Sequence, residues 1–305
     1  MNEANAKSSK LIGKGSALIR AAFGVVLFAS FQYFAQVIFY NLGFDGVRNE
    51  GLFNFSYGIL VSVLLLIYIR ITKKPGEGNL IYRDKMNIPQ WVLVVIIGLG
   101  MLAWVSLYFD LAHYISELMP KVKQSVSEYQ THVGRSSETK QFVIPKWDHV
   151  LYVLGVTLAI PLVEELAFRG LVLGELRKQF SPAVSIIMSG LFFGVLHVQP
   201  VQVIYAVFCG VILGAVYYCC DSIWASFTIH AIFNFMGSGV SQMMKSGLIG
   251  VGEKGKNAIY TGMTYIEFIM LLPSVFALTF LFVLHNKKKA EANAKEEVEV
   301  ANEQA

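Results

Sequence analysis

The chain has 305 residues, of which 55% are hydrophobic and only 15% are charged, and its formal net charge is +4. This composition is too apolar for an ordinary soluble domain and predicts a protein whose main partner is the lipid bilayer. It gives no support to a nucleic-acid-binding function. The three cysteines, Cys209, Cys219 and Cys220, lie in or at the end of one apolar segment. This placement argues against the spaced framework of an exported disulfide-rich protein.

Eight apolar stretches follow one another along the chain, and each approaches the roughly 20 residues that a helix needs to cross the hydrocarbon layer. The sequence therefore predicts an all-α fold, a polytopic transmembrane helical bundle of about eight helices. The predicted spans cover approximately residues 21–42, 53–71, 91–111, 149–173, 182–198, 201–220, 223–240 and 265–284.

These spans divide the chain into an amino-terminal tail, three scaffold helices, a loop, a core of four helices, a second loop, a last helix and a charged tail. The corresponding residues are 1–20, 21–111, 112–146, 147–242, 243–264, 265–285 and 286–305. Lys and Arg are more frequent on the side of the amino terminus than in the opposite loops, which predicts that both termini are cytoplasmic. The layout, poor in proline and without a disulfide framework, suits a bacterial cell membrane.

The loop over residues 112–146 continues an amphipathic pattern, which Pro120 interrupts. Its apolar residues recur at steps of three and four, as expected for a helix that lies on a membrane surface. They are Leu111, Ile115, Leu118, Val122, Val126 and Tyr129. Two interpretations stay open, a solvated loop with one surface helix and a lid over a substrate path.

Polar and ionisable side chains within the predicted spans gather in the second half of the chain. Charged groups cost roughly 2.5–3.5 kcal/mol each inside a bilayer, so they are rarely kept there without a partner or a task. The first three spans hold nothing comparable. The candidates occupy the fourth, fifth and seventh spans: Glu164, Glu165, Arg169, His197, His230 and Asn234.

The spacing in the fourth span separates its two glutamates. Glu165 precedes Arg169 by four residues, which is the favourable order for an ion pair along a helix. Glu164 lies about 100° further around the helix and is left without that partner. A carboxylate in a poorly solvated cavity is suited to take a proton from water if a second group holds the water. His197 is the candidate for that second group.

His230 and Asn234 are four residues apart in the seventh span, so both side chains project from one face of a helix. Both can donate hydrogen bonds into the same cavity. Two donors directed at one point are what a tetrahedral oxyanion requires during amide hydrolysis. The pattern therefore indicates water activation on one side of a cavity and oxyanion stabilisation on the other.

Three segments resemble known motifs. Residues 164–169 resemble the EExxxR motif, 193–197 the FxxxH motif and 230–234 the HxxxN motif. In this order, on separate helices, they are similar to the motifs of the CAAX-protease and bacteriocin-processing (CPBP, or Abi) family of intramembrane endopeptidases. The resemblance covers roughly residues 147–242 and is specific because the three motifs occur together.

The resemblance implies roles for the candidate residues. Glu164 and His197 activate the attacking water, while His230 and Asn234 stabilise the oxyanion. Glu165 and Arg169 support the site: the residues alone favour a structural ion pair. Relatives in this family cleave prenylated proteins, process peptides, confer bacteriocin immunity or regulate membrane sensors, and these residues do not choose among such tasks.

The predicted function is hydrolysis of a peptide bond in a membrane-embedded or lipid-anchored peptide or protein. A non-catalytic immunity or regulatory partner is the alternative, and a transporter is disfavoured because repeat-related broken helices are not evident. No cofactor is predicted, since the HExxH pattern of zinc peptidases is absent. The alternative is a Zn²⁺ ion held by Glu164, His197 and His230.

The predicted spans contain one geometrical conflict. Counting about 1.5 Å per residue from the cytoplasmic edge places His230 roughly 10 Å deep and His197 more than 20 Å deep. The mechanism requires these side chains to meet. A fourth helix that continues to Arg177, a tilted fifth helix or a kink at Pro161 would remove the conflict.

Overall fold

The computed structural model describes residues 3–44, 48–73, 78–138, 144–197 and 199–303, and this part of the chain contains helices and no strands. The all-α prediction is confirmed. The helices are α1 (Glu3–Asn41), α2 (Glu50–Thr72), α3 (Ile88–Leu118), α4 (Pro120–Glu138), α5 (Lys146–Leu154), α6 (Ile160–Glu165), α7 (Leu173–Leu176), α8 (Pro182–Val195), α9 (Pro200–Cys220), α10 (Ile223–Asn234), α11 (Val240–Lys245) and α12 (Glu253–Glu303).

Three π-helical turns join some of these helices into longer rods. They are Gly155–Ala159 between α5 and α6, Leu166–Val172 between α6 and α7, and Phe235–Gly239 between α10 and α11. A π turn adds a residue to the helical repeat and so rotates the side chains that follow it. The predicted fourth and seventh spans are therefore continuous helices whose faces change direction along their length.

Six described helices are long and apolar enough to cross a membrane. They are Ile12–Asn41, Glu50–Thr72, Ile88–Leu118, Lys146–Leu176, Pro200–Cys220 and Glu253–Glu299. The predicted fifth span corresponds to α8, a shorter apolar helix, and the seventh corresponds to α10 and α11. Each of the eight predicted stretches coincides with a helix over most of its described length, so the protein is a helical membrane bundle.

Several helix ends differ from those predicted. The third helix continues to Leu118, α12 begins inside the predicted loop 243–264, and the two predicted tails are helical from Glu3 and up to Glu303. Hydropathy marks only the apolar part of a helix, because backbone hydrogen bonds continue into polar sequence beyond it. Val198, the predicted end of the fifth span, residues 139–143 of the predicted loop and residues 1–2 and 304–305 of the tails lie outside the described residues.

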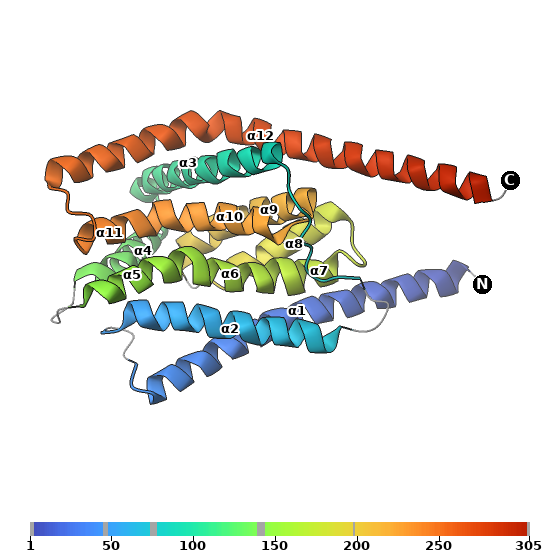
Figure 1. Ribbon diagram of the computed structural model, residues 1–305. Helices are drawn as coiled ribbons and strands as arrows, with labels where there is room; N and C mark the ends of the chain where they lie inside the picture. Colours follow the sequence, from blue (N-terminus) through green and yellow to red (C-terminus); the bar gives the residue numbers. More distant parts are fainter. Residues whose placement is uncertain (1–2, 45–47, 74–77, 139–143, 198, 304–305) are drawn as a thin grey trace.

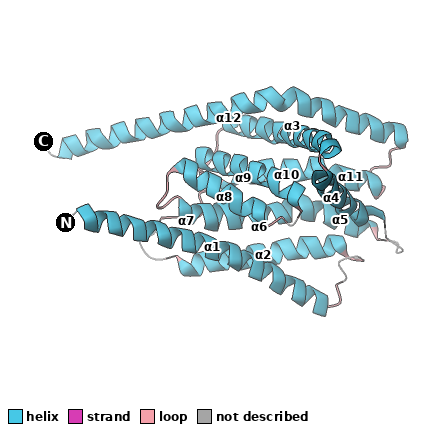
Figure 2. Ribbon diagram, turned by 180° about the vertical axis from the view of Figure 1, so that it is seen from behind, coloured by secondary structure: helices cyan, strands magenta, loops and turns pink. Residues whose placement is uncertain are grey.

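The rods lie roughly side by side, and both chain ends are at the same end of the bundle (Figures 1 and 2). The amino-terminal part of α1 and the carboxyl-terminal part of α12 project beyond the other helices there. This arrangement agrees with two termini on one side of the membrane. Their cytoplasmic location and the bacterial origin stay predictions.

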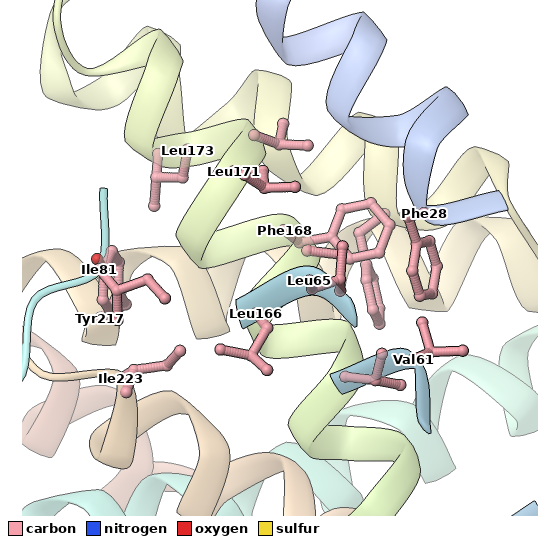
Figure 3. Packing of buried hydrophobic residues seen from close by; sticks show 14 of the residues in the cluster. Phe28, Val61, Leu65, Ile81, Leu166, Phe168, Leu171, Leu173, Tyr217 and Ile223 are labelled. Atoms are coloured by element: carbon pink, nitrogen blue, oxygen red, sulfur yellow. The ribbon is translucent and has the colours of Figure 1, made fainter. Parts of the chain in front are cut away.

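The central rod, α5 to α7, is surrounded by other helices. Figure 3 shows Phe168 and Leu171 of this rod packed among Phe28 of α1 and Leu65 of α2. The Phe28 and Phe168 rings meet edge to face with centroids 5.7 Å apart, an arrangement that aromatic pairs prefer. The first two helices therefore act as a scaffold for the rod that carries the two glutamates.

Small residues allow the helices around this rod to approach closely. A Cβ on Gly58 of α2 would lie 2.7 Å from the backbone carbonyl carbon of Ala159, and one on Gly210 of α9 would lie 2.9 Å from the Cα of Gly190 of α8. Such contacts exclude a larger side chain without a shift of the helices. The pattern of small residues four apart on α8 and α9 thus places these two helices in backbone contact.

The end of the bundle that carries the termini is closed by the segment between α2 and α3. The backbone N–H of Tyr82 donates to the hydroxyl of Tyr217 at 3.0 Å, and the Ile223 N–H donates to the Tyr82 carbonyl at 2.9 Å. The guanidinium of Arg177 lies 4.0 Å from the Tyr82 ring centroid and 3.3 Å from a carboxylate oxygen of Asp221. These contacts join α7, α9 and α10 at one end.

Candidate active site

Glu165 and Arg169 form a fully buried ion pair in the central rod. Arg169 Nε lies 3.0 Å from Glu165 Oε2, and both side chains are 0% exposed. The contact is an ion pair without hydrogen-bond geometry, since neither Glu165 Oε2 nor the Arg169 nitrogens form a hydrogen bond within the described part of the chain. The Arg169 guanidinium also lies 5.2 Å from the centroid of the Phe193 ring on α8. The predicted pairing is confirmed, and it connects the first motif to the second.

His230 of α10 lies between the two glutamates. Its Nδ1 is 3.0 Å from Glu165 Oε1, and its Nε2 is 3.4 Å from Glu164 Oε2. Because a carboxylate can only accept, Nδ1 donates its hydrogen to Glu165, and this bond fixes the orientation of the ring. The spacing along the helix left Glu164 without a partner, but the structure places its carboxylate in contact with His230. The Glu164 side chain keeps 19% exposure.

Asn234 is joined to the central rod by a bond that follows from Pro161. In the π turn Gly155–Ala159 the backbone bonds reach five residues back. Continuing this register would require an N–H at position 161 to reach the carbonyl of Val156, and proline has none. The Asn234 side-chain amide donates to this carbonyl instead, at 2.9 Å. One amide hydrogen therefore has a structural partner, and the second is left for the cavity.

His197 follows α8 and lies beside the same cluster. The Phe193 ring is 5.1 Å from the His197 ring and 5.8 Å from the His230 ring, centroid to centroid. His197 Nδ1 lies 3.1 Å from the Phe193 carbonyl oxygen. His197 and His230 line one cavity, so the predicted conflict in depth does not occur. Helices α8 and α10 begin at Pro182 and Ile223, the residues from which depth was counted, so the distance counted along each helix does not give depth in the bundle.

One cavity of about 460 Å³ collects four of the six predicted site residues, namely Glu164, His197, His230 and Asn234. Glu165 and Arg169 do not line it and lie behind Glu164 and His230. The other lining residues are Met101, Tyr129, Tyr152, Val156, Ile160, Phe193, Gln202, Tyr205, Ala206, Cys209, Leu213, Phe233, Gly237 and Ser238. The cavity combines apolar walls with a few convergent polar groups, as binding sites commonly do.

Three tyrosines in this lining did not stand out in the sequence. Tyr152 belongs to α5, and Tyr129 of α4 meets Tyr205 of α9 with hydroxyl oxygens 3.3 Å apart. Their residue type alone carries no signal, because a tyrosine in a membrane helix is common at the interface. Tyr129 was singled out only as part of the apolar stripe of the loop.

The alternative zinc site is not assembled by this geometry. Among the described residues, no group of three His, Cys, Asp or Glu side chains is arranged to hold a metal ion. Glu164 and His230 are in contact, whereas His197 Nδ1 faces a backbone carbonyl. A zinc ion takes at least three protein ligands in catalytic sites. The absence of a cofactor stays a prediction.

Residues 146–236 match the family described as Type II CAAX prenyl endopeptidase Rce1-like. This part of the chain resembles the core of a CAAX protease. The match contains all three motifs and confirms the family that they predicted. Helices α1 to α4, α11 and α12 lie outside the matched segment. No curated protein and no solved structure matches the chain.

Replacement of Arg169 by Met is expected to destabilise the helical core strongly. Removing one partner of a buried pair leaves the Glu165 charge uncompensated, at a cost of about 3–5 kcal/mol. Thermal unfolding of the detergent-purified protein measures this as a lower Tm. Lys256→Met is the matched control, since it removes a cation paired with the exposed Glu253 and should cost less than about 1 kcal/mol. Equal effects of the two variants would contradict the assignment.

Proposed function

We propose that this protein is an intramembrane endopeptidase that hydrolyses a peptide bond in a membrane-embedded or lipid-anchored peptide or protein. The observation that carries the proposal is the convergence of Glu164, His197, His230 and Asn234 on one cavity within the helical bundle. They come from three separate rods, so no local feature of one helix accounts for their meeting. The core belongs to a family of peptidases, which agrees with this chemistry.

The first step is activation of water by Glu164 and His197. Glu164 takes a proton from a water molecule that His197 orients, and the resulting hydroxide attacks the carbonyl carbon of the substrate. Both side chains line the cavity, and the Glu164 carboxylate is partly exposed there. Glu164 then returns the proton to the amide nitrogen as the carbon–nitrogen bond breaks.

The second task is stabilisation of the tetrahedral oxyanion. His230 faces the cavity with Nε2, which donates when both ring nitrogens carry hydrogen, because Nδ1 already donates to Glu165. Asn234 retains one amide hydrogen beyond its bond to Val156. Donors fixed in a site of low dielectric stabilise developing charge without reorganising. The buried Glu165–Arg169 pair acts indirectly, through His230, because Glu165 holds the His230 ring in position.

The position of α4 favours the lid interpretation of the loop 112–146. Tyr129 of α4 lines the cavity and meets Tyr205 of α9, and Val126 is buried against Val201. The lining residues Tyr152 and Gln202 also belong to the ends of helices away from the chain termini, where Figure 1 places α4 and α5. We infer that substrate reaches the cavity beside α4.

A non-catalytic immunity or regulatory partner is the second candidate function. It would use the same fold and cavity to bind a peptide without cleaving it. The buried supporting pair and the Asn234 bond agree with either function, since both interactions stabilise the fold. The Glu164 carboxylate separates the two, because only catalysis requires it to accept a proton.

Glu164→Gln is expected to reduce peptide-bond hydrolysis by about 10²–10⁴-fold, since it keeps the side-chain shape and removes the base. Comparative peptidomics of membranes from wild type and variant measures the loss and identifies the substrate. Asn234→Ala should cost about 10²–10³-fold.

Glu267→Gln is the matched control, because Glu267 also lies in an apolar helix but outside the cavity, where it accepts a hydrogen bond from Ser106 at 3.2 Å. It should leave the peptide pattern unchanged. A biological phenotype that survives both Glu164→Gln and Asn234→Ala would assign that phenotype to the non-catalytic function.

Removal of metals is expected to leave hydrolysis unchanged, because the proposed steps use only protein side chains and water. The test incubates the purified protein with an excess of chelator and then follows cleavage of the substrate found by peptidomics. Activity that vanishes and returns on addition of Zn²⁺ would instead favour the zinc-dependent alternative.

A bulky group attached at position 129 is expected to block access to the cavity. A Tyr129→Cys variant would be treated with a maleimide carrying a polyethylene glycol chain, and cleavage should fall at least about tenfold. The native thiols Cys209, Cys219 and Cys220 are buried and should remain unlabelled. The same label on Lys123→Cys, an exposed position of α4 outside the cavity lining, is the control. Equal inhibition from both positions would exclude access beside Tyr129.

A further inference from the structure

A second concavity lies on the outside of the bundle and shares no lining residue with the catalytic cavity. It measures about 540 Å³ and is formed by α8, α9 and α12. We call it the α8–α12 groove; its lining residues are Pro182, Ala183, Ile186, Ile187, Val211, Ile212, Ala215, Tyr218, Leu278, Phe282, Asn286 and Lys289.

The α8–α12 groove changes from apolar to polar along its length. On α12 its residues Leu278, Phe282, Asn286 and Lys289 are separated by four, four and three positions, so they form one stripe along the helix. The last apolar span is predicted to end at residue 284, which places Asn286 and Lys289 at the level of lipid headgroups. The apolar walls of the groove, which on α12 are Leu278 and Phe282, lie at the depth of the hydrocarbon layer.

Lys289 differs from the two lysines that precede it. Lys288 lies 3.3 Å from a carboxylate oxygen of Asp84, and Lys287 lies 4.0 Å from one of Glu291. Within the described part of the chain, no carboxylate pairs with Lys289. Its positive charge therefore remains uncompensated at the polar end of the α8–α12 groove.

From this arrangement we infer that the α8–α12 groove binds an anionic phospholipid. One acyl chain lies along the apolar walls, and the phosphate lies between the Lys289 ammonium and the Asn286 amide. An acyl chain matches the apolar walls, and a negatively charged headgroup matches the Lys289 ammonium, because anionic lipids are attracted to basic residues at the membrane surface. A peptide would leave its backbone polar groups without partners along these walls.

The site is relevant to the catalytic core because of the helices that form it. Helix α9 presents Val211 and Ile212 to the α8–α12 groove, and it presents Cys209 and Leu213 to the cavity. Helix α8 leads directly into His197. A bound lipid would therefore brace the two helices of the core that carry the second motif and one cavity wall.

The test is native mass spectrometry of the full-length protein in detergent, titrated with phosphatidylglycerol or with phosphatidylcholine. The first phosphatidylglycerol should bind wild type at least about fivefold more tightly than phosphatidylcholine does, as expected for one basic contact at the headgroup. Lys289→Glu should abolish this preference. Lys287→Glu is the matched control, since it makes the same charge change two residues away and outside the groove lining, and it should preserve the preference.

A second pair of variants tests the apolar walls. Ala183→Phe fills the α8–α12 groove and should weaken binding of both lipids, whereas Val184→Phe places the same side chain at an exposed neighbour outside the groove and should not. Equal affinity of wild type for the two lipids, or equal loss in Lys289→Glu and Lys287→Glu, would overturn the proposal and indicate only general attraction to a basic tail. Unchanged binding in Ala183→Phe would overturn the placement of the acyl chain.

Discussion

The buried ion pair between Glu165 and Arg169 is the constraint on which the arrangement of the site depends. Two charges without solvent exposure require close mutual compensation, since desolvation of each is costly. Glu165 meets this requirement with its two oxygens, one toward Arg169 and one toward His230. The pair therefore fixes the position of α10 against the central rod. It also fixes the direction in which the His230 ring faces the cavity.

Irregular helical geometry is the second determinant of the site. The π turn before Pro161 removes a backbone donor from the Val156 carbonyl, and Asn234 supplies one from another rod. A second π turn begins at Leu166, directly after the cavity-facing Glu164 and the paired Glu165. Such turns change the faces of a helix without breaking it. The two neighbouring glutamates lie in the α-helical segment between these turns, where the ordinary 100° step already gives them different environments, one fully buried and one open to the cavity.

The scaffold helices contribute by closeness of packing rather than by chemistry. Gly58 brings α2 against the π turn of the central rod, and Gly190 with Gly210 brings α8 against α9. Without hydrophobic driving force between helices in lipid, such contacts gain their stability from van der Waals packing. The result is that a short helix, α8, holds His197 beside two rods that cross most of the bundle.

The sequence by itself determined the helical membrane class, the family and the Glu165–Arg169 pair, because these depend on local composition and on spacing along one helix. It also indicated the six candidate side chains, whose polarity is conspicuous in apolar surroundings. The tertiary structure alone decided that His230 bridges both glutamates, that Asn234 bonds to Val156 and that α4 brings Tyr129 to the cavity. Span counting failed for His197 because hydropathy gives the position of a residue along its helix but not the placement of that helix relative to its neighbours. Contacts between rods depend on helix register, which no periodicity within one segment contains.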